Sequence, residues 1–510
     1  MELQDKDLRS VQETRELLGR AKEAAKELAN MNQQQIDRIV AAISEAGISH
    51  AEKLAKMANQ ETGFGIWQDK VIKNLFAAKT VYDAIKDQRT VGILREDRQK
   101  KVWDIGVPVG VIAALVPSTN PTSTVIYKAM ISLKGGNAVV FSPHPSAKEC
   151  ILETVRILAE AAERAGCPRG AISAIGIPTM EATSELMKHE HTALILATGG
   201  GAMVKAAYSS GTPAIGVGAG NGPAFIDQSA DLPMAVKRIL DSKTFDNGTI
   251  CASEQSIIIE ASMEEAVTQE LKRQGAYLLD EAQAKQLGQF ILRASGTMNP
   301  QIVGKSCHQI AEYANLSGIP KTARVLVAKE TGVGKGAPYS REKLAPILGL
   351  FVEKNVDDVL KKSIEILLME GAGHTFCMHA NDEELVKRFA LKIPASRFLV
   401  NTPGSLGGVG ATTKLFPAMT LGCGAVGGSS TSNNIGPMDV INIRRVGFGA
   451  RELSELRQSG ADVLKNQIGS CGCLTESYIS GGGSQSFSRS VSISQNLVDE
   501  IVERILKELV

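Results

Sequence analysis

The chain has almost no net charge and no long apolar run, and each absence excludes a class of protein. Its 510 residues carry 56 Lys and Arg against 55 Asp and Glu, without a basic block interleaved with aromatics. A nucleic-acid surface is therefore not expected. The longest apolar run, 107–116, is broken by Pro108 and Gly110 and is far shorter than a membrane span. Because the first residues are acidic and polar, unlike a secretory signal, we expect a soluble cytoplasmic protein.

Cysteine is sparse as well, and its pattern predicts reduced thiols instead of a disulfide framework. The chain has 8 cysteines, of which Cys150, Cys167 and Cys377 lie in or beside apolar stretches, as buried structural thiols do. The cysteine pair in 471–473 has no nearby histidine, and a strand over 374–379 would arrange its His and Cys side chains unfavourably for one ion. We therefore predict no metal site.

Two patterns of apolar residues follow one another along the sequence and together predict an α/β protein. Residues 5–90 repeat apolar side chains at helical spacing. From residue 110, short apolar runs such as 110–116, 138–141 and 193–197 end in Pro- or Gly-rich turns and alternate with helical stretches. This alternation of strands and helices is typical of a parallel sheet with helices on both faces. A second series of strands and helices follows, so we expect two α/β domains.

Composition suggests where these domains end. We expect a first domain over 1–226 that contains a charged hairpin at 90–105, a second domain over 227–425, and a return segment over 426–450 with a late strand at 437–447. The hairpin and the late strand are expected to pair outside the main sheets. Residues 451–494 begin with helical positions and become a Ser- and Gly-rich linker, and 495–510 form a short amphipathic helix. Such a short helix is marginal in water, so it needs a surface to lie against.

Polar and small residues gather where the first strands are expected to end. The strand ends carry 117–121, 142–145 and 198–201, and ligands of open α/β sheets bind beyond the carboxyl ends of the strands. The third of these stretches opens a helix whose free N–H groups suit a phosphate, although a plain tight turn explains it equally well. Cys251 lies among small and polar residues, a setting that suits either an exposed nucleophile or an ordinary loop thiol.

Several longer strings resemble a known family. The strings 116–124, 141–148, 213–221, 243–255 and 420–424 are similar to the CoA-acylating aldehyde dehydrogenases and to the aldehyde half of bifunctional aldehyde-alcohol dehydrogenases. The resemblance covers about residues 5–450, so we expect no alcohol dehydrogenase half. It implies an aldehyde dehydrogenase-like fold: a Rossmann-type cofactor domain, an α/β catalytic domain and a small oligomerisation β-element from the hairpin and return segment. A homodimer or homotetramer is implied as well.

The resemblance also implies a role for each matching residue. Cys251 matches the nucleophile that forms a thiohemiacetal and then a thioester, and Asn120 matches the amide that stabilises the oxyanion with the Cys251 N–H. His374 either helps to deprotonate CoA or is a satisfied core histidine. Glu342 matches the carboxylate that holds the nicotinamide ribose. The other cofactor positions implied are Ser118, Thr119, Ser142, His144, Thr198, Gly199, Gly200, Gly218 and Gly220.

The same alignment addresses the fate of the thioester. Hydrolytic relatives carry a general-base glutamate where Val217 stands here when Pro223 is aligned, and neither Val217 nor Gly218 can take a proton from water. The resemblance therefore implies acyl transfer: aldehyde, CoA and NAD⁺ give acyl-CoA and NADH. NAD is implied, with NADP left open because Ala147 lies where hydrolytic relatives carry the discriminating carboxylate.

The identity of the substrate and even the class of protein leave alternatives. Acetaldehyde and propionaldehyde are the leading substrates implied. Acylating oxidation of sulfoacetaldehyde and a hydrolytic aldehyde dehydrogenase are alternatives. A different class is a shell-associated interaction protein with vestigial chemistry, against which the retained Cys251 and Asn120 argue.

A Ser/Gly linker followed by an amphipathic helix resembles the encapsulation peptides of enzymes inside bacterial microcompartments. The resemblance implies that 495–510 binds shell proteins and that the enzyme lies in the lumen. Such a segment at the C-terminal end is typical of compartments of the glycyl-radical type. A helix that docks on its own oligomer is the alternative, and a membrane surface is disfavoured because Arg504 and Lys507 face four acids.

Overall fold

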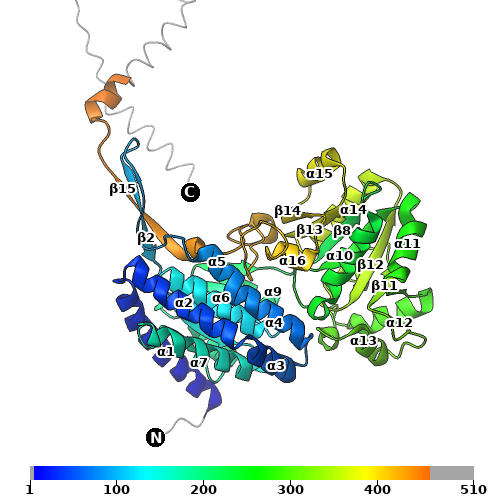
Figure 1. Cartoon of the computed structure of the whole chain (residues 1–510), viewed down its shortest axis with the longest axis horizontal. Coiled ribbons are helices and arrows are strands. Elements are labelled where there is room, and N and C mark those ends of the chain that lie inside the picture. Colours follow the sequence, from blue (N-terminus) through cyan, green and yellow to red (C-terminus); the bar gives the residue numbers. More distant parts are fainter. Residues whose placement is uncertain (1–4, 460–510) are drawn as a thin grey trace, which may run out of the picture. The chain divides into compact units, whose positions relative to one another are not determined.

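The N-terminal part of the chain is helical, as its apolar spacing predicts. The computed structural model describes residues 5–459. Asp5 caps the first helix, and Asn32 forms a capping box with Gln35 at the start of the second, so local polar residues begin both helices. The helices are α1 (Lys6–Leu28), α2 (Gln33–Ser49), α3 (Ala51–Thr62), α4 (Trp67–Leu75) and α5 (Val81–Ile85), with a π-helical turn at Phe76–Thr80. Figure 1 shows them in blue beside the cyan helices α6 and α7.

A five-stranded parallel sheet follows, in the order β5-β4-β3-β6-β7. The chain starts at β3, moves outward through β4 and β5, and then returns to the other side of β3. The carboxyl ends of β3, β4 and β6 therefore surround the point where the winding reverses, which is where such sheets bind ligands. The elements are β3 (Val111–Val116), α6 (Pro121–Lys134), β4 (Ala138–Pro143), α7 (Lys148–Arg164), β5 (Ile172–Ala174), α8 (Met180–Lys188), β6 (Thr192–Thr198), α9 (Gly201–Tyr208) and β7 (Ala214–Val217).

The second sheet has seven parallel strands in the order β10-β11-β12-β9-β8-β13-β14. Its strands are β8 (Gly222–Ile226), β9 (Glu254–Glu260), β10 (Ala276–Leu278), β11 (Val325–Lys329), β12 (Ile347–Glu353), β13 (Gly373–His379) and β14 (Ala395–Val400). The helices are α10 (Leu232–Thr244), α11 (Glu264–Arg273), α12 (Glu281–Ile291), α13 (Cys307–Tyr313), α14 (Val356–Met369), α15 (Glu383–Ala390) and α16 (Gly404–Gly408). Figure 1 shows these elements in green and yellow, with helices on both faces of the sheet.

The chain changes sheet slightly earlier than the sequence suggests. We expected the first domain to extend to 226, but β8 pairs with β9 and β13 of the seven-stranded sheet. The crossing lies between Val217 and Gly222, in a glycine-rich stretch too short to show as a boundary in composition. This stretch therefore lies between the two sheets.

A third sheet is antiparallel and small, with the order β1-β2-β15. Strands β1 (Gly92–Asp97) and β2 (Val102–Pro108) form a hairpin, and β15 (Ile441–Gly447) lies along β2 from Pro108 to Val102. The late strand thus pairs with the charged hairpin outside the main sheets, as the sequence predicts. In Figure 1 the two labelled strands of this sheet run side by side.

A second compact unit begins at Phe448. Residues 453–459 are helical, in agreement with the helical positions expected after 450. The rest of the expected linker and the amphipathic helix at 495–510 lie outside the described residues. Within 5–459, no helix combines the length and the apolar character that crossing a membrane requires.

Candidate active site

Cys251 lies in a tight loop between α10 and β9. The loop begins with a short 3-10 turn at Phe245–Gly248, where Asp246 and Asn247 adopt left-handed conformations with φ of 48° and 52°. Such values are uncommon outside glycine and mark a backbone that its surroundings hold in place. The thiol is partly buried. Burial and then the Glu342 carboxylate raise the pKa of Cys251 to about 12, against the opposing charge of Arg397.

The glycine-rich stretch between the two sheets packs directly behind Cys251. A Cβ atom on Gly220 would come within 1.9 Å of the Cys251 carbonyl oxygen, so only glycine fits there. The Gly220 N–H donates to Glu342 Oε1 at 2.9 Å, and the Asn221 amide donates to the Ser340 carbonyl at 2.7 Å. The loop with Cys251, the 218–221 stretch and the segment around Glu342 are therefore locked together. Gly220 thus packs closely against the Cys251 backbone, and its expected contact with the cofactor stays a prediction.

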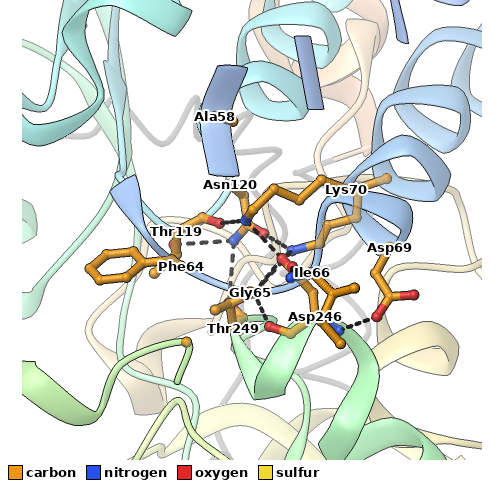
Figure 2. A network of polar contacts seen from close by, with 12 residues as sticks. Ala58, Phe64, Gly65, Ile66, Asp69, Lys70, Thr119, Asn120, Asp246 and Thr249 are labelled. Carbon is orange, nitrogen blue, oxygen red and sulfur yellow. Dashed lines mark hydrogen bonds and ion pairs between the residues drawn. The ribbon is translucent and has the colours of Figure 1, made fainter. Parts of the chain in front are cut away.

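Asn120 begins α6 and reaches the same loop from the other side. Its Oδ1 accepts a hydrogen bond of 2.5 Å from Lys73 Nζ, and its Nδ2 donates to the Thr249 carbonyl at 3.3 Å, two residues before Cys251. Nδ2 also donates to Thr119 Oγ1 at 3.2 Å. Figure 2 shows Asn120 beside Asp246 and Thr249 in one polar network. The structure thus brings Asn120 and the loop with Cys251 together, as the sequence predicts.

An apolar cavity of about 310 Å³ opens next to this loop. Ile250, the neighbour of Cys251, contributes to its wall together with Phe245. The other lining residues come from α4, from the π-helical turn after it and from residues 406–419: Ile72, Lys73, Leu75, Phe76, Lys79, Thr80, Leu406, Val409, Ala411 and Met419. π-helical turns occur often at functional sites. A small apolar molecule in this cavity would lie beside the Cys251 loop.

A second cavity, of about 150 Å³, lies at the carboxyl ends of β3, β4 and β6. The expected cofactor residues Ser142, His144, Thr198, Gly199 and Gly200 all line it. No atom lies within 4 Å of the position that a Cβ would take on either glycine, so a ligand can approach this backbone closely. Burial lowers the pKa of His144, which favours its neutral form. The arrangement suits the adenosine end of a dinucleotide at the reversal point of the sheet.

The other expected cofactor positions lie elsewhere. The Thr119 carbonyl accepts a hydrogen bond from Lys70 Nζ at 3.2 Å, so Thr119 belongs to the network around Asn120. Ser118 lies between Thr119 and Pro117, a residue that lines the 150 Å³ cavity. Gly218 lies near Cys423, whose Sγ would be 3.9 Å from an added Cβ.

Glu342 is partly buried, near enough to Cys251 for its charge to act on the thiol. Burial raises its pKa to about 8, against the opposing effect of the Gly220 N–H. The neighbouring Lys343 is fixed by the carbonyl groups of Tyr339 and Arg341, at 2.9 and 2.6 Å. The Arg341 guanidinium pairs with Glu370. These contacts hold the segment around Glu342 in place. Because its pKa is raised, the Glu342 carboxyl is largely protonated below about pH 8.

His374 is fully buried at the start of β13. Its Nδ1 lies 2.9 Å from Thr375 Oγ1, and within the described part of the chain its Nε2 has no hydrogen-bond partner. Burial and the charge of Arg397 lower the pKa of His374 to about 3. The imidazole is therefore neutral at physiological pH and is a weak acceptor for a thiol proton.

The sequence reasoning missed the charged residues behind Asn120. Lys70 and Lys73 are 3% exposed, whereas Ile72 on the same helix is 51% exposed, so α4 buries its charged face. The signal available was Lys-x-x-Lys on a short helix whose apolar residues lie on the other face. Within 5–459, no group of three or more His, Cys, Asp or Glu side chains gathers in a way that could hold a metal ion.

The chain is similar to known aldehyde dehydrogenases in sequence. Residues 5–339 match the model of the aldehyde dehydrogenase family. The bifunctional aldehyde-alcohol dehydrogenase of Escherichia coli K12 is 44% identical over 449 residues, which are 87% of this chain and 50% of that protein. The chain thus spans about half the length of these bifunctional curated relatives.

Solved structures of aldehyde dehydrogenases are similar to this chain over most of its length. A probable aldehyde dehydrogenase from Listeria monocytogenes is 63% identical with a TM-score of 0.88, covering 89% of this chain and 100% of that one. An acetylating aldehyde dehydrogenase from Geobacillus thermoglucosidasius is 51% identical with a TM-score of 0.87, covering 88% and 99%. A propionaldehyde dehydrogenase from the Clostridium phytofermentans fucose utilisation microcompartment is 28% identical with a TM-score of 0.77, covering 86% and 98%. The chain belongs to the aldehyde dehydrogenase family, among its CoA-acylating members.

Proposed function

We propose that the chain oxidises short apolar aldehydes to acyl-CoA, with Cys251 as the nucleophile and NAD⁺ as the hydride acceptor. The observation that carries this proposal is the junction of three features at one loop. The loop that carries Cys251 lines an apolar cavity through Ile250, the Asn120 amide faces the same loop, and the 218–221 stretch packed against the Cys251 backbone contains no carboxylate. Identity of 51% to an acetylating aldehyde dehydrogenase supports the same activity.

In this proposal the thiolate of Cys251 attacks the aldehyde carbon and forms a thiohemiacetal. The Asn120 Nδ2 and the Cys251 N–H stabilise the oxyanion that develops on the former carbonyl oxygen. Because the pKa of Cys251 is about 12, only about one thiol in ten thousand or fewer is ionised near neutral pH, so the rate should rise with pH. A cofactor bound in the strand-end cavity would supply the hydride acceptor for the thiohemiacetal carbon, and an acyl thioester would then remain on Cys251.

The strand-end cavity holds the adenosine end of the cofactor. Ser142 and His144 at the end of β4 contact the ribose, and the Thr198–Gly200 turn approaches the pyrophosphate at the start of α9. Glu342 would hold the nicotinamide ribose through Oε2 while its Oε1 keeps the hydrogen bond from the Gly220 N–H. NAD is proposed over NADP, and Ala147 near the ribose leaves that preference open to a direct test.

Acyl transfer then competes with hydrolysis. Val217 ends β7 as a buried apolar side chain, so the position of the general base in hydrolytic relatives cannot activate water. The nearby acid is Glu342, which is held by the Gly220 N–H and is largely protonated at neutral pH. The thioester therefore waits for the thiolate of CoA, which expels Cys251 as the leaving thiolate. His374 acts as a neutral hydrogen-bonding group toward the thioester, since its low pKa disfavours a role as base.

The cavity lining favours uncharged aldehydes. Nine of the twelve lining residues of the 310 Å³ cavity are apolar. Lys73 is already neutralised by Asp246, and Lys79 is paired with Asp83. A sulfonate would lose its hydration in the cavity without gaining a free cation, and a desolvated anion is costly to bury. Acetaldehyde and propionaldehyde are therefore the proposed substrates, ahead of sulfoacetaldehyde.

Assembly and location belong to the same proposal. The three-stranded sheet of β1, β2 and β15 leaves one edge of β1 and one edge of β15 unpaired among the described residues, and such edges can pair with another subunit. A homodimer or homotetramer is proposed on this basis. For 495–510 we propose binding to microcompartment shell proteins, on the strength of the apolar stripe in the sequence.

One kinetic experiment tests the activity. Purified protein is assayed for NADH with acetaldehyde, propionaldehyde and sulfoacetaldehyde, each with and without CoA, and acyl-CoA and free acid are measured. Cys251→Ala should abolish NADH formation, and free acid should stay a minor product of the wild type. Glu342→Gln should leave the ratio of acid to acyl-CoA unchanged, because Glu342 is not the base for water. Equal rates with and without CoA would favour a hydrolytic enzyme.

A further inference from the structure

Helix α4 buries two of its charged side chains and exposes apolar ones, the reverse of the usual arrangement. Lys70 and Lys73 are 3% exposed, whereas Ile72 and Leu75 are 51% and 37% exposed. Burying an ammonium group is costly unless it is paired and hydrogen-bonded. The exposed apolar side chains line the 310 Å³ cavity beside the Cys251 loop, and Lys73 lines it as well, so α4 forms part of the cavity wall while it buries two cations.

Asp246 neutralises these cations from the loop that carries Cys251. Its carboxylate forms ion pairs with Lys73 and, at 3.0 Å, with Lys70. It also accepts hydrogen bonds from the Ile66 N–H at 2.6 Å and from Thr249 Oγ1 at 2.7 Å. Figure 2 shows Lys70, Ile66 and Thr249 converging on this carboxylate. The Asp246 carboxylate therefore fastens the start of α4 to the Cys251 loop.

The backbone around Asp246 is shaped for this contact. Gly65 has φ of +72°, and a Cβ there would lie 1.8 Å from Asp246 Oδ1, so only glycine allows the carboxylate to reach the Ile66 N–H. Asp246 itself takes a left-handed conformation, and its N–H donates to Asp69 Oδ2 at 2.7 Å. Several independent constraints thus hold one buried carboxylate, which indicates a dedicated network instead of an incidental ion pair.

Lys73 extends the network to the oxyanion donor. Its Nζ donates to Asn120 Oδ1 at 2.5 Å and to Thr249 Oγ1 at 3.0 Å. An ammonium group has three donors and no acceptor, so it can bond only the oxygen of the Asn120 amide. The Nδ2 of Asn120 must then face away from Lys73, toward the Thr249 carbonyl and the loop that ends at Cys251. The charge on Lys73 thereby selects one of the two amide orientations.

We propose that Lys73, held by Asp246, is a positioning residue that orients the Asn120 amide toward the oxyanion formed at Cys251. The proposal rests on the acylating function given above. Lys73 touches neither the reacting atoms nor the cofactor in this role, and it acts through Asn120. Since the oxyanion forms in both the acylation and the transfer to CoA, Lys73 should affect both steps.

The network also predicts a dependence on pH. The groups that face Lys73 are Asp246 from the Cys251 loop, Lys70 and Asp69 from α4, and the uncharged Asn120 and Thr249. Burial lowers the pKa of Lys73 to about 8, against the opposing charge of Asp246. A neutral amine has a lone pair and can accept from an amide N–H, so it no longer selects the orientation of Asn120. The turnover of the wild type relative to Asn120→Ala, a ratio in which the ionisation of Cys251 cancels, should therefore fall as pH rises through about 8.

The test is a double-mutant cycle in the full-length chain. Asn120→Ala should lower turnover about 10²- to 10³-fold, as the loss of an oxyanion donor does, and Lys73→Met about tenfold to a hundredfold. In the Asn120→Ala background, Lys73→Met should have little further effect, and KM for CoA should stay within about twofold. Lys26→Met, an exposed lysine on α1 that pairs with Glu23, is the matched control and should leave turnover unchanged. Equal fold-losses from Lys73→Met in both backgrounds would overturn the proposal.

The pH profile gives an independent check. When the turnover of each protein is divided by that of its Asn120→Ala counterpart, Lys73→Met should abolish the loss near pH 8. Asp246→Asn, which keeps the lysine and removes its carboxylate, should move that loss to lower pH because the charge of Asp246 raises the pKa of Lys73. If Lys73→Met does not fold, the Asp246→Asn variant provides the test. A loss that stays near pH 8 in Asp246→Asn would refute the proposal. Failure of the function itself is recognised separately, by a Cys251→Ala variant that retains activity.

Discussion

Replacing Gly220 by Ala should misplace Cys251 without touching any ligand. An ideal Cβ on residue 220 would lie 1.9 Å from the Cys251 carbonyl oxygen, 2.6 Å from its carbonyl carbon and 3.0 Å from its Cβ. Real Cβ atoms essentially never approach closer than 3.0 Å, so the two segments must separate by about 1 Å. The Gly220 N–H is tied to Glu342 and Asn221 is tied to Ser340, so the stretch cannot easily retreat. The loop with Cys251 is therefore expected to move.

The size of the effect follows from that displacement. A misplacement of about 1 Å in a reacting group costs about 10²-fold in rate, and overpacking a well-filled interior costs about 1–3 kcal/mol of stability. We therefore expect a turnover about a hundredfold lower in Gly220→Ala with KM for the aldehyde little changed, and a lower unfolding midpoint. The rate of alkylation of Cys251 by iodoacetamide should change as well, because the thiol leaves its present surroundings.

A matched glycine provides the control. Gly19 lies within α1 with no atom within 4 Å of an added Cβ, so Gly19→Ala should keep full turnover and gain up to about 1 kcal/mol of stability. Stopped-flow and steady-state NADH formation would be compared across the three proteins, alongside thermal unfolding. Wild-type turnover and an unchanged unfolding midpoint in Gly220→Ala would show that the 218–221 stretch does not hold Cys251 in place.

Two further predictions concern stability and location. His379 is buried with neither ring nitrogen bonded within the described chain, so His379→Leu should raise the unfolding free energy at pH 7.5 by about 1 kcal/mol. Burial lowers its folded pKa to about 4 from 6.5, so the unfolded wild type binds more protons between these values, and its stability falls on acidification. In urea unfolding, the difference in unfolding free energy between His379→Leu and the wild type should therefore be larger at pH 5 than at pH 7.5. An equal difference at the two pH values would contradict the argument. Deleting 490–510 should leave NADH formation intact and abolish co-purification with shells, and unchanged shell association would defeat the assignment of the tail.

Much of the fold follows from local patterns in the sequence. The helical spacing of 5–90 and the apolar runs at 110–116 and 138–141 correspond to α1–α5, β3 and β4, because buried parallel strands read as short unbroken apolar runs. The strands that escaped notice are short or lack such a run. β5 and β10 are three residues long, and β7 and β8 contain glycine or proline. Their pairing comes from neighbours far away in the sequence, which no local pattern records.

The same limit applies to the site. Sequence motifs indicated Cys251, Asn120 and the strand-end residues, since each type stands in a recognisable string. They did not indicate what each backbone contact does. Gly220 packs against the Cys251 backbone and the Thr119 carbonyl accepts a hydrogen bond from Lys70, and neither contact is visible in a motif. Which way a side chain points is settled by tertiary packing, and here the residues in contact are 31 positions apart for Gly220 and Cys251 and 49 for Thr119 and Lys70.

The residues around Cys251 divide into two sets that act on different steps. Lys73, Asp246 and Asn120 approach from the helical layer and bear on the oxygen of the substrate, whereas Gly220, Glu342 and Ser340 lie behind the sulfur and fix its backbone. Loosening the first set should slow acylation and transfer to CoA in parallel, because both steps pass through an oxyanion. Loosening the second set should also admit water behind the thioester, because the close contact of Gly220 with Cys251 leaves no room for a solvent molecule there. Acyl transfer without hydrolysis thus depends on tight packing behind the sulfur as well as on the apolar side chain at position 217.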